Sequence, residues 1–511
     1  MTDVKREIER KYESEGGALP DLTGTAGVAE AVGRGVVTLD ATYYDTADRR
    51  LAAASLTLRR RTGGEDAGWH LKVPVAPGVR DEIRAPLSDT VPDHLAALVR
   101  ARVRATPLVP LVRLRSAREV THLLDARGTL LAEASVDTVT AHLLTGGSGD
   151  ARSGGGAGAE VHWTEIEVEL ADGADPRVLD KLDKRLRKAG VRPARSASKL
   201  AHALELTGAA PHRPAARRAR PVTAGDHVLA YVRAHREALL AHDPGVRRDV
   251  PDAVHRMRVA TRRLRSTFRS FGTVLDPAVT GPLAAELKWL AGELGADRDQ
   301  EVLTARLEAA LGAVPSALVL GPVRERIAAW SGARHGSAHG HLLAILDSAR
   351  YLGLLDAVDA LLADPPLRGK GARQPGPVLA GAVAKDLRAI DRHLTEALEL
   401  PPGAGRDTAL HEARKKAKRA RYAAEAAVPA LGRPARRLAK ALKKLTGGLG
   451  EHQDAVMARR TLRELAAVAH AAGESAFTYG LLYGREEERS ARAEARAPEL
   501  WGKVSGRAAA L

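Results

Sequence analysis

The sequence predicts two domains, a strand-rich one followed by an all-helical one built from two related halves. Up to residue 206 the chain shows short runs in which apolar and polar residues alternate, as strands do. From residue 226 onward Ala, Leu, Glu and Arg recur at helical spacing, and one basic motif is written twice. At 511 residues the chain is also too long for one ordinary core.

The first domain is expected to consist of strands with two helical interruptions. The predicted strands are Val4–Glu13, Leu56–Arg61, His70–Val73, Arg80–Arg84, Val112–Arg118, Leu130–Asp137 and Thr164–Leu170. The predicted helices are Pro92–Arg104 and Asp175–Ala189. A Gly/Ser-rich insert at Thr145–Ala159 predicts a mobile hairpin loop. A Pro-, Ala- and Arg-rich segment at Thr207–Gly225 predicts an interdomain linker. The expected domains are therefore 1–206 and 226–511, joined by a linker at 207–225.

Charged side chains share one face of most of these strands. In the first strand Glu7, Glu9 and Lys11 project together, and near the end of the domain Glu165, Glu167 and Glu169 form a pure carboxylate row. A solvated face is the ordinary explanation for one such strand. Six or seven in a row would repel one another unless something bridges them. A barrel would enclose these faces as a polar tunnel, in which a divalent cation and a phosphate chain could neutralise the rows.

The net charge of +16 lies entirely in the second part of the chain. Residues 1–210 contain 30 Lys/Arg and 30 Asp/Glu, which leaves 49 and 33 for the remainder. This asymmetry favours a polyanionic partner for the helical domain. The chain has no cysteine, which excludes disulfides and thiolate metal sites. We expect a cytoplasmic protein, because no secretory signal or membrane-spanning run is found.

The basic motif gives the polyanion a place to bind. Its first copy is His255, Arg258, Arg262, Arg263 and Arg265, and its second copy, 156 residues later, is His411, Arg414, Lys418, Arg419 and Arg421. Steps of +3, +7 and +10 from the histidine put four residues of each copy on one helical stripe, and Arg263 lies one step off it and widens it. The text after each copy repeats as well, with Leu294-Gly295 matching Leu449-Gly450.

The first copy contains no acidic residue to relieve the repulsion, which favours a bound anion. For the histidines a capping or core role remains an alternative, and for Lys415-Lys416 a solvated face is favoured. Nucleic acid is the rival ligand, but aromatic residues make up only 3% of the chain. A ligand that is all phosphate and no base fits better. The sequence does not point to a nucleic-acid or membrane partner.

Two stretches resemble known families. Glu7-Ile8-Glu9-Arg10-Lys11, followed by Tyr43-Tyr44-Asp45-Thr46 and Leu71-Lys72-Val73, resembles the ExExK signature and later strands of the CYTH superfamily, the triphosphate tunnel metalloenzymes. The duplicated helical part resembles a CHAD domain. Together these resemblances imply an α+β domain with a closed antiparallel eight-stranded tunnel barrel, plus an all-α domain of two pseudo-symmetric helical bundles.

The CYTH resemblance implies hydrolysis of inorganic triphosphate, or of a related triphosphorylated compound, with Mg²⁺ or Mn²⁺. It implies Glu7, Glu9, Lys11 and Lys72 as catalytic residues. The implied metal ligands are Glu7, Glu9, Glu165, Glu167, Glu169 and Asp137, and the implied substrate-binding residues are Arg59, Arg61, Glu82, Arg84, Arg113, Arg115 and Lys199. The base that activates water, the substrate and the choice of metal stay open.

The CHAD resemblance implies binding of inorganic polyphosphate along a basic surface. Besides both motif copies, the implied residues include Lys415 and, on neighbouring helices, Lys288, Arg298, Lys443 and Lys444. Association with polyphosphate granules would be compatible with this. A non-catalytic polyphosphate scaffold is the main alternative, and a cyclic-AMP-forming activity would need nucleotide recognition that the sequence does not reveal. Oligomeric state and coupling between the domains stay open.

Overall fold

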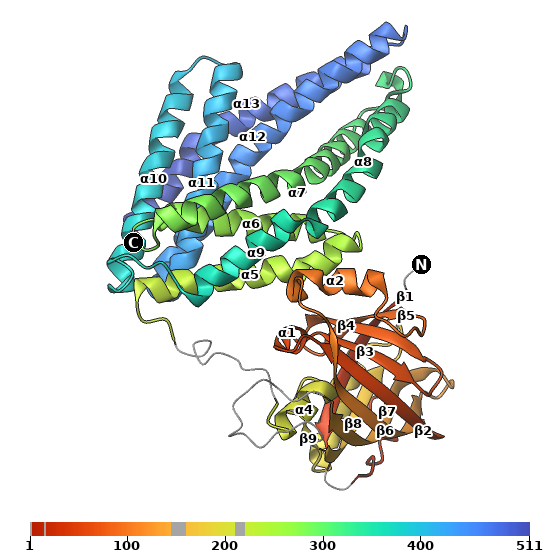
Figure 1. Ribbon diagram of the computed structural model, residues 1–511. Helices are drawn as coiled ribbons and strands as arrows, with labels where there is room; N and C mark the ends of the chain where they lie inside the picture. The colour runs from red at the N-terminus through yellow and green to blue at the C-terminus, as the bar shows by residue number, and fades with distance from the viewer. Residues whose placement is uncertain (1–2, 15–16, 145–159, 210–219) are drawn as a thin grey trace. The chain divides into compact units, whose positions relative to one another are not determined.

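A computed structural model of the chain divides into two compact units, Met1–Arg218 and Ala219–Leu511 (Figure 1). It describes residues 3–14, 17–144, 160–209 and 220–511, with the side chains of 296–299 and 333–338 excepted. The predicted hairpin loop at Thr145–Ala159 and the central part of the predicted linker lie outside the described residues. No described helix is long and apolar enough to cross a membrane.

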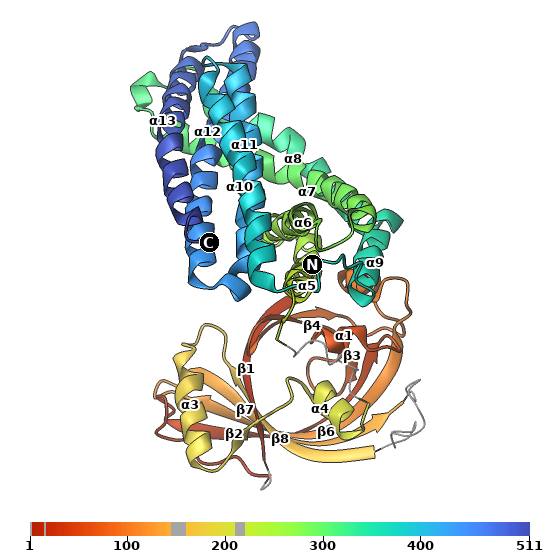
Figure 2. The same ribbon diagram turned by 90° about the vertical axis from the view of Figure 1, so that its left-hand side faces the viewer.

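The first unit is a closed antiparallel barrel of eight strands, as predicted. The strands are β1 (Asp3–Glu13), β2 (Glu30–Asp45), β3 (Thr57–Thr62), β4 (Gly68–Ala76), β5 (Val79–Ala85), β6 (Val109–Leu124), β7 (Leu130–Leu143) and β8 (Glu160–Leu170), and the two-residue β9 (Arg192–Pro193) adds to β1. The order runs β5-β4-β3-β2-β6-β7-β8-β1, and β1 also pairs with β5, which closes the ring (Figure 2).

Apolar residues cover the outside of this barrel, and α4 closes one end of its interior. The helix α3 (Arg177–Lys188) packs on an outer apolar cluster formed by β1, β7 and β8. The helix α2 (Asp93–Val103) packs on a second outer apolar cluster, formed by β3, β4 and β5. The short α4 (Lys199–Leu206) buries Leu200 and Leu204 against Leu114 of β6 and Val139 of β7, and Figure 2 shows it inside the ring. The charged strand faces therefore turn inward, toward a tunnel that α4 blocks at one end.

The sequence did not reveal β2, which pairs along its length with β6. Its first half is largely exposed, and the register shifts between Gly33 and Gly35, where the chain bulges. Glycine in a strand has no side chain to alternate and often marks such a bulge. Only the second half of β2 alternates between buried and half-buried residues, so the period-two signal is short and weak.

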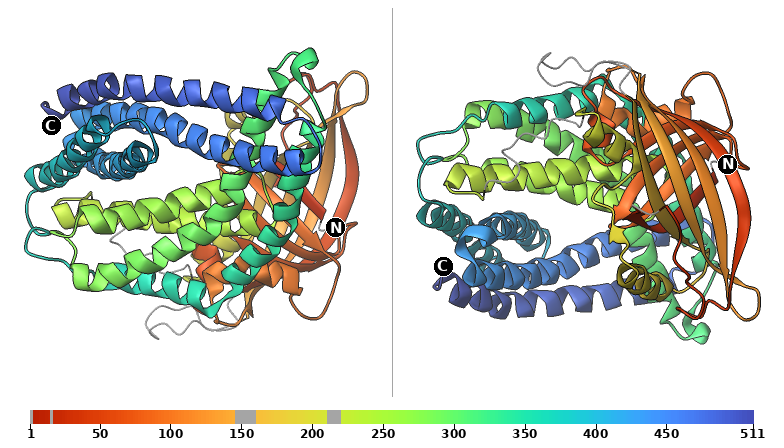
Figure 3. Two further views of the ribbon diagram at one scale, coloured as in Figure 1. Left: turned by 90° about the horizontal axis from the view of Figure 1, so that it is seen from above. Right: turned by 90° about the horizontal axis from the view of Figure 1, so that it is seen from below.

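The second unit consists of helices, as predicted, and its two halves place the duplicated motif on equivalent helices. The first half holds α5 (Ala224–Arg247), α6 (Ala253–Ser270), α7 (Pro277–Gly312), α8 (Val323–Asp347) and α9 (Ala349–Ala363); the second holds α10 (Pro375–Glu399), α11 (Ala404–Leu431), α12 (Arg433–Ala471) and α13 (Phe477–Ala508). The motif copies lie on α6 and α11, which pack against each other (Figure 3). Proline is the first residue of α7 and of α10, where its missing N–H costs nothing.

Candidate functional site

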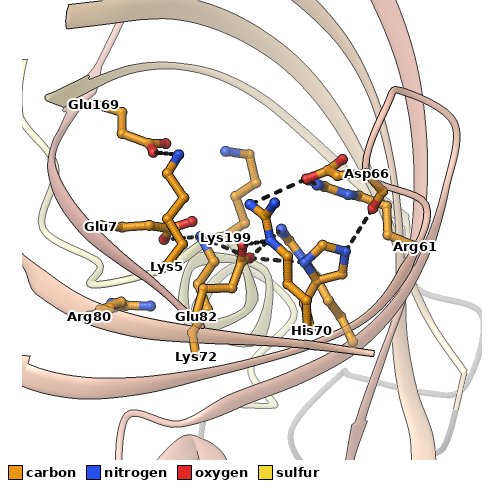
Figure 4. Close-up of polar contacts among 12 residues, drawn as sticks. Lys5, Glu7, Arg61, Asp66, His70, Lys72, Arg80, Glu82, Glu169 and Lys199 are labelled. Carbon is orange, nitrogen blue, oxygen red and sulfur yellow. Dashed lines mark hydrogen bonds and ion pairs between the residues drawn. The ribbon is translucent and has the colours of Figure 1, made fainter. Parts of the chain in front are cut away.

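A cavity of about 500 Å³ occupies the barrel, and most of its lining is charged. Strand register explains this, because residues two apart on one strand face the same side. The acidic lining residues include Glu7, Glu9, Glu82, Glu133, Glu167 and Glu169, and the basic ones include Lys5, Lys11, Arg59, Arg61, Lys72, Arg80, Arg84, Arg118 and Lys199. Figure 4 shows several of these side chains converging from opposite walls.

The carboxylates of β1 and β8 form one acidic wall. Glu9 pairs with Glu169 across the strands, and Glu7 lies one step further along the same face of β1. Each is held by an ammonium: Lys72 lies 2.5 Å from Glu7, Lys5 lies 2.5 Å from Glu169, and Lys11 lies 3.4 Å from Glu9. Burial raises the pKa of Glu7. It would do the same for Glu9, but the combined positive charge of Lys11, Lys72 and Arg80 outweighs burial, and the pKa of Glu9 falls below its usual value.

A second acidic group lies deeper, around the ammonium of Lys199. Its nitrogen is 3.0 Å from Asp137, 2.6 Å from Glu165 and 2.7 Å from Glu167. Arg118 donates to Asp137 and, at 2.6 Å, to Glu167. Although burial disfavours charge, the carboxylates raise the pKa of Lys199, and the cations lower that of Glu167. Asp137 and Glu165 are buried and are not part of the cavity lining. The oxygens of Asp137 are committed to Arg118 and Lys199, and those of Glu165 to Lys199 and the indole N–H of Trp163.

The neighbouring strands β5, β4 and β3 form a cationic wall, organised around Glu82 of β5. Glu82 accepts from Arg84 at 2.7 Å and from Arg59 at 3.4 Å, and it lies 3.0 Å from the Nδ1 of His70. Burial lowers the pKa of His70 to about 4, so the ring is neutral at pH 7. Glu82 keeps its pKa below the usual value despite burial, because His70 and Lys72 favour its charged form. It therefore orients cations and has little freedom to bind a metal.

The guanidinium of Arg61 shows how crowded this wall is. Burial, together with the nearby Arg59, lowers the pKa of Arg61 to about 9. Asp66 forms an ion pair with it. Such a group gains from any anion that enters the cavity.

The structure corrects the expectation that Arg113 or Arg115 lines the tunnel. On β6 they project to the outer face, where Arg113 lies 2.6 Å and Arg115 3.4 Å from Asp40. The inward residues of this strand have even numbers, and Arg118 lines the cavity together with Val120 and His122. Arg113 and Arg115 are therefore one residue out of phase with the inward face.

Lys5 and Arg80 also line the cavity and were not assigned by the sequence. Lys5 shares the face of Glu7 and Glu9, so parity along β1 could have found it. Arg80 shares a face with Glu82 and Arg84 on β5. The alternation of side chains along β5 could therefore have identified Arg80 as well.

The lining carboxylates fit a divalent cation. Carboxylate oxygens are the donors that Mg²⁺ and Mn²⁺ prefer. Glu7, Glu9 and Glu169 line the cavity and are neutralised by flexible lysines, which can swing away. Among the described residues, Asp137, Glu165 and Glu167 have their carboxylates at metal-like spacing, which Glu7, Glu9 and Glu169 do not, but there the cation is already supplied by Lys199. The first group is therefore the better candidate among the described residues.

In the helical unit the two motif copies meet in one cationic cluster. Lys418 of α11 lies among Arg414 and Arg421 of its own helix and Arg258 and Arg262 of α6. Burial and these four guanidinium groups lower the pKa of Lys418 to about 7. Asp454 of α12 lies near Arg414 and Lys418, and burial raises the pKa of its carboxyl. Repulsion within this motif cluster is a cost that a polyanion would offset.

Beside the motif cluster, α6, α7, α10 and α11 enclose a broad cavity of about 1120 Å³, the α10 cavity. No carboxylate lines it, and its floor includes Gly281 and Gly381, where a Cβ atom would meet nothing within 4 Å. Its nine cations are Arg265, Arg269, Lys288, Lys370, Arg373, Lys385, Arg388, Lys416 and Arg419. Among the described residues, Arg419 alone of these has an ion-pair partner, Asp386 at 2.6 Å.

The remaining predicted residues lie outside this pair of features or at their edge. Arg263 pairs with Glu425 at 2.9 Å, and Lys415 is exposed and pairs with Glu412 at 2.6 Å. His255, Lys443 and Lys444 are exposed and His411 is half-buried, while the side chain of Arg298 lies outside the described ones. The structure thus brings Arg258, Arg262, Arg414, Lys418 and Arg421 together, and places Arg265, Lys288 and Arg419 in the α10 cavity.

Comparison with known proteins agrees with both halves of this description. A CYTH domain profile matches residues 5–203, and a CHAD domain profile matches residues 230–463. Two uncharacterized proteins of Mycobacterium tuberculosis are 39% identical over 493 residues, covering 95% of this chain and 94% of their own length. The chain belongs to the CYTH-CHAD family.

Solved structures similar to this CYTH-CHAD protein match one half each. PptA from Streptomyces chartreusis is 22% identical with a TM-score of 0.45, covering 55% of this chain and 100% of its own. The CHAD domain of the plant Ricinus communis is 26% identical with a TM-score of 0.43, covering 57% and 93%. A putative adenylyl cyclase from Hippeastrum, described as having a dominant triphosphatase activity, is 16% identical with a TM-score of 0.22, covering 41% and 96%.

One glycine of each CHAD repeat seats an arginine of the motif cluster. A Cβ atom on Gly295 of α7 would lie 2.9 Å from the Nη2 of Arg258, and one on Gly450 of α12 would lie 3.2 Å from the Nη2 of Arg414. Packing therefore explains why glycine recurs in the repeated Leu294-Gly295 and Leu449-Gly450 pairs: each guanidinium lies against a neighbouring helix at a position without a side chain.

Replacing Gly295 and Gly450 with alanine should displace both arginines without unfolding the helices. Alanine favours helix by about 1 kcal/mol over glycine, which offsets the local crowding. We expect an unchanged or higher melting temperature and a polyphosphate affinity reduced by about tenfold, because two charge-assisted contacts lose their geometry. Gly292→Ala/Gly447→Ala is the matched control, since Cβ atoms at these positions of the same helices meet nothing within 4 Å. Equal affinities for the two double variants would contradict this positioning role.

Proposed function

We propose that the CYTH unit is a divalent-metal-dependent triphosphatase that hydrolyses inorganic triphosphate or a related triphosphorylated compound. The observation that supports it is that two charged walls lie side by side in one cavity. A carboxylate wall contributed by Glu7, Glu9 and Glu169 adjoins a cationic wall contributed by β3, β4 and β5. A linear triphosphate with a bound metal carries the complementary charges, and the 500 Å³ volume suits a small ligand.

Each wall has a distinct chemical task. Glu7, Glu9 and Glu169 would hold Mg²⁺ or Mn²⁺, which supplies charge neutralisation at phosphate oxygens and a more acidic bound water. Arg59, Arg61 and Arg84 would bind phosphate oxygens through paired N–H donors, and Lys72 and Lys11 would act as point charges. Release of Lys72 from Glu7, and of Lys5 from Glu169, would free carboxylates for the metal and ammonium groups for the substrate in one rearrangement. Preorganised positive charge of this kind stabilises phosphoryl transfer to water.

A substrate panel tests this proposal. Phosphate release from tripolyphosphate, thiamine triphosphate and ATP would be measured with Mg²⁺, with Mn²⁺ and with EDTA. We expect turnover of at least one substrate with a divalent metal and none with EDTA, because no arrangement of lysines replaces the metal at buried carboxylates. Absence of turnover with every metal, alongside tight binding of tripolyphosphate, would instead favour a non-catalytic tunnel.

For the helical unit we propose binding of inorganic polyphosphate by the motif cluster and the α10 cavity together. Both features gather cations from helices far apart in sequence, and Arg265 and Arg419 of the α10 cavity come from the same two helices as the cluster. Aromatic side chains are scarce: Phe268 is the single aromatic residue lining the α10 cavity, and it is buried. Nucleic acid would find little to stack on, so a ligand made of phosphate alone fits better.

Salt dependence tests the electrostatic basis of this binding. The logarithm of polyphosphate affinity should fall linearly with the logarithm of salt concentration, because bound cations displace counterions from the polyanion. A slope of about −3.5 or steeper is expected if at least five cations engage, by analogy with the slope of about −0.7 per contact on single strands. Fluorescence anisotropy of labelled polyphosphate at several NaCl concentrations would measure it, and a flat profile would count against the proposal.

One observation supports the alternative that the whole protein is a non-catalytic polyphosphate scaffold. In the structure every carboxylate of the acidic wall already has a cationic partner, so the tunnel is neutralised without metal. Tight polyphosphate binding with no turnover in the substrate panel would select this alternative.

A further inference from the structure

A second groove in the helical unit also gathers cations, at a distance along the chain from both motif copies. It has a volume of about 720 Å³ and lies between the N-terminal part of α12 and the C-terminal part of α13. Its charged lining residues are Arg437, Lys440 and Lys444 of α12 with Lys503 and Arg507 of α13, and no carboxylate lines it. We call it the α12–α13 groove.

Helical spacing aligns the cations of this groove. Successive residues of Arg437, Lys440 and Lys444 are three and four positions apart, so they form one stripe along α12. Lys503 and Arg507, four positions apart, form another stripe on α13. The two helices run side by side (Figure 3), and a Cβ atom on Gly448 would lie 2.7 Å from a methyl carbon of Leu500. This close approach closes one end of the groove. Beyond it, two rows of like charge face each other.

The charge of α12 is hard to explain by helix stability. Residues 433–444 contain six Lys/Arg and no acidic residue. Exposed helices gain from acidic partners one turn away, and cations in the first turns oppose the helix dipole. Among the described residues, only Lys503 of the five groove cations has an ion-pair partner, Glu499. The cations of α13 near its C-terminus suit the dipole. Those of α12 repel one another with no acidic residue among them, a cost that a bound anion would offset.

We propose that the α12–α13 groove is a second binding site for an inorganic phosphate oligomer, distinct from the motif cluster and the α10 cavity. The lining residues other than the cations are Ala441, Leu500 and Gly506, so there is no aromatic platform for a base. Four of the eight lining residues lie on α13, beyond residue 463, where the match to the CHAD profile ends. The proposal rests on the proposed polyphosphate binding of this unit. It adds that a long chain is held at two sites, so that its affinity exceeds that of a short one.

Two matched variants of the full-length protein test this. The groove variant is Arg437→Gln/Lys440→Gln/Lys444→Gln, and the control is Arg433→Gln/Arg436→Gln/Arg463→Gln. Both remove three charges from exposed positions of α12, and glutamine is a good helix former. Titration calorimetry with short-chain and long-chain inorganic polyphosphate is the measurement. For the groove variant we expect a loss of about tenfold or more in long-chain affinity and loss of one of two short-chain sites, since a second linked site adds avidity.

The outcomes separate this inference from the function beneath it. Wild-type protein that binds no polyphosphate would reject the proposed function of the helical unit. Wild-type binding that the groove variant and the control reduce equally would reject the α12–α13 groove alone, since general charge would then explain the loss. A single-stranded DNA oligonucleotide of matched charge that competes as well as polyphosphate, and loses affinity in the groove variant, would overturn the phosphate-only assignment.

Discussion

Replacing Glu7 and Glu9 with glutamine should abolish metal-dependent phosphate release while leaving the barrel folded. Glutamine keeps the shape and a hydrogen-bonding oxygen but removes the charge that holds a divalent cation. Loss of electrostatic stabilisation at one such position typically lowers kcat by about 10²-fold or more, and here two are removed. Initial rates with tripolyphosphate and saturating Mg²⁺ or Mn²⁺ would measure the effect.

The control for this variant is Glu13→Gln on the same strand. Glu13 lies at the end of β1, accepts a hydrogen bond from the backbone of Arg195, and does not line the cavity. Its loss should leave kcat/KM within about twofold, because it touches neither wall. Binding of tripolyphosphate without metal should also survive in the Glu7→Gln/Glu9→Gln variant, since the cationic wall is intact. Equal turnover by this variant and wild type would reject the proposed metal site.

The two-sided arrangement of the tunnel could be predicted because side-chain parity is a strong sequence signal. Glu7, Glu9 and Lys11 on β1, and Glu165, Glu167 and Glu169 on β8, could be assigned to one face from spacing alone. What spacing does not give is depth. Glu165 and Glu169 share a face, yet only Glu169 lines the cavity. Glu165 is buried behind the lining and pairs with Lys199. That difference depends on where α4 enters the barrel, which is a tertiary fact.

The errors have the same physical origin. The CYTH resemblance implies Arg113 and Arg115, but it does not fix which face of β6 points inward. The buried apolar Val112 and Leu114 share the parity of Arg118. In the helical unit the repeat identified the motif residues but not their partners. Arg258 approaches Gly295, and Lys418 approaches Arg262, only because α6, α7 and α11 pack together.

Replacing Lys418 with methionine should change stability and binding in opposite directions. The ammonium of Lys418 is surrounded by guanidinium groups and partly desolvated, which lowers its pKa to about 7. An unfolded lysine has a pKa of about 10.4, so between these values the unfolded chain binds more protons and the free energy of unfolding rises with pH. Methionine has similar length without the charge, so the helical unit should be stabilised by about 1 kcal/mol or more at pH 7.

The same variant should bind polyphosphate about tenfold more weakly, because a hydrogen bond to a charged group contributes about 1.5–3 kcal/mol. In wild type, polyphosphate should also favour protonated Lys418, so binding near pH 7.5 should take up protons. Calorimetry in two buffers of different ionisation enthalpy would detect this, and methionine should reduce the uptake. Stability would be measured by denaturant titration of the transition that polyphosphate shifts, at pH 6.5 and pH 9.

Lys415→Met is the control for stability. Lys415 lies three residues earlier on α11, is exposed, and pairs with Glu412 at 2.6 Å, so its charge is compensated. Its loss should not stabilise the unit, because surface ion pairs contribute about 0–1 kcal/mol. Two results would contradict this prediction. A Lys418→Met variant less stable than wild type would mean that the charge of Lys418 does not destabilise the fold, and unchanged affinity would mean that Lys418 does not bind polyphosphate. A stability gain together with an affinity loss would instead show that this repulsion is retained for binding.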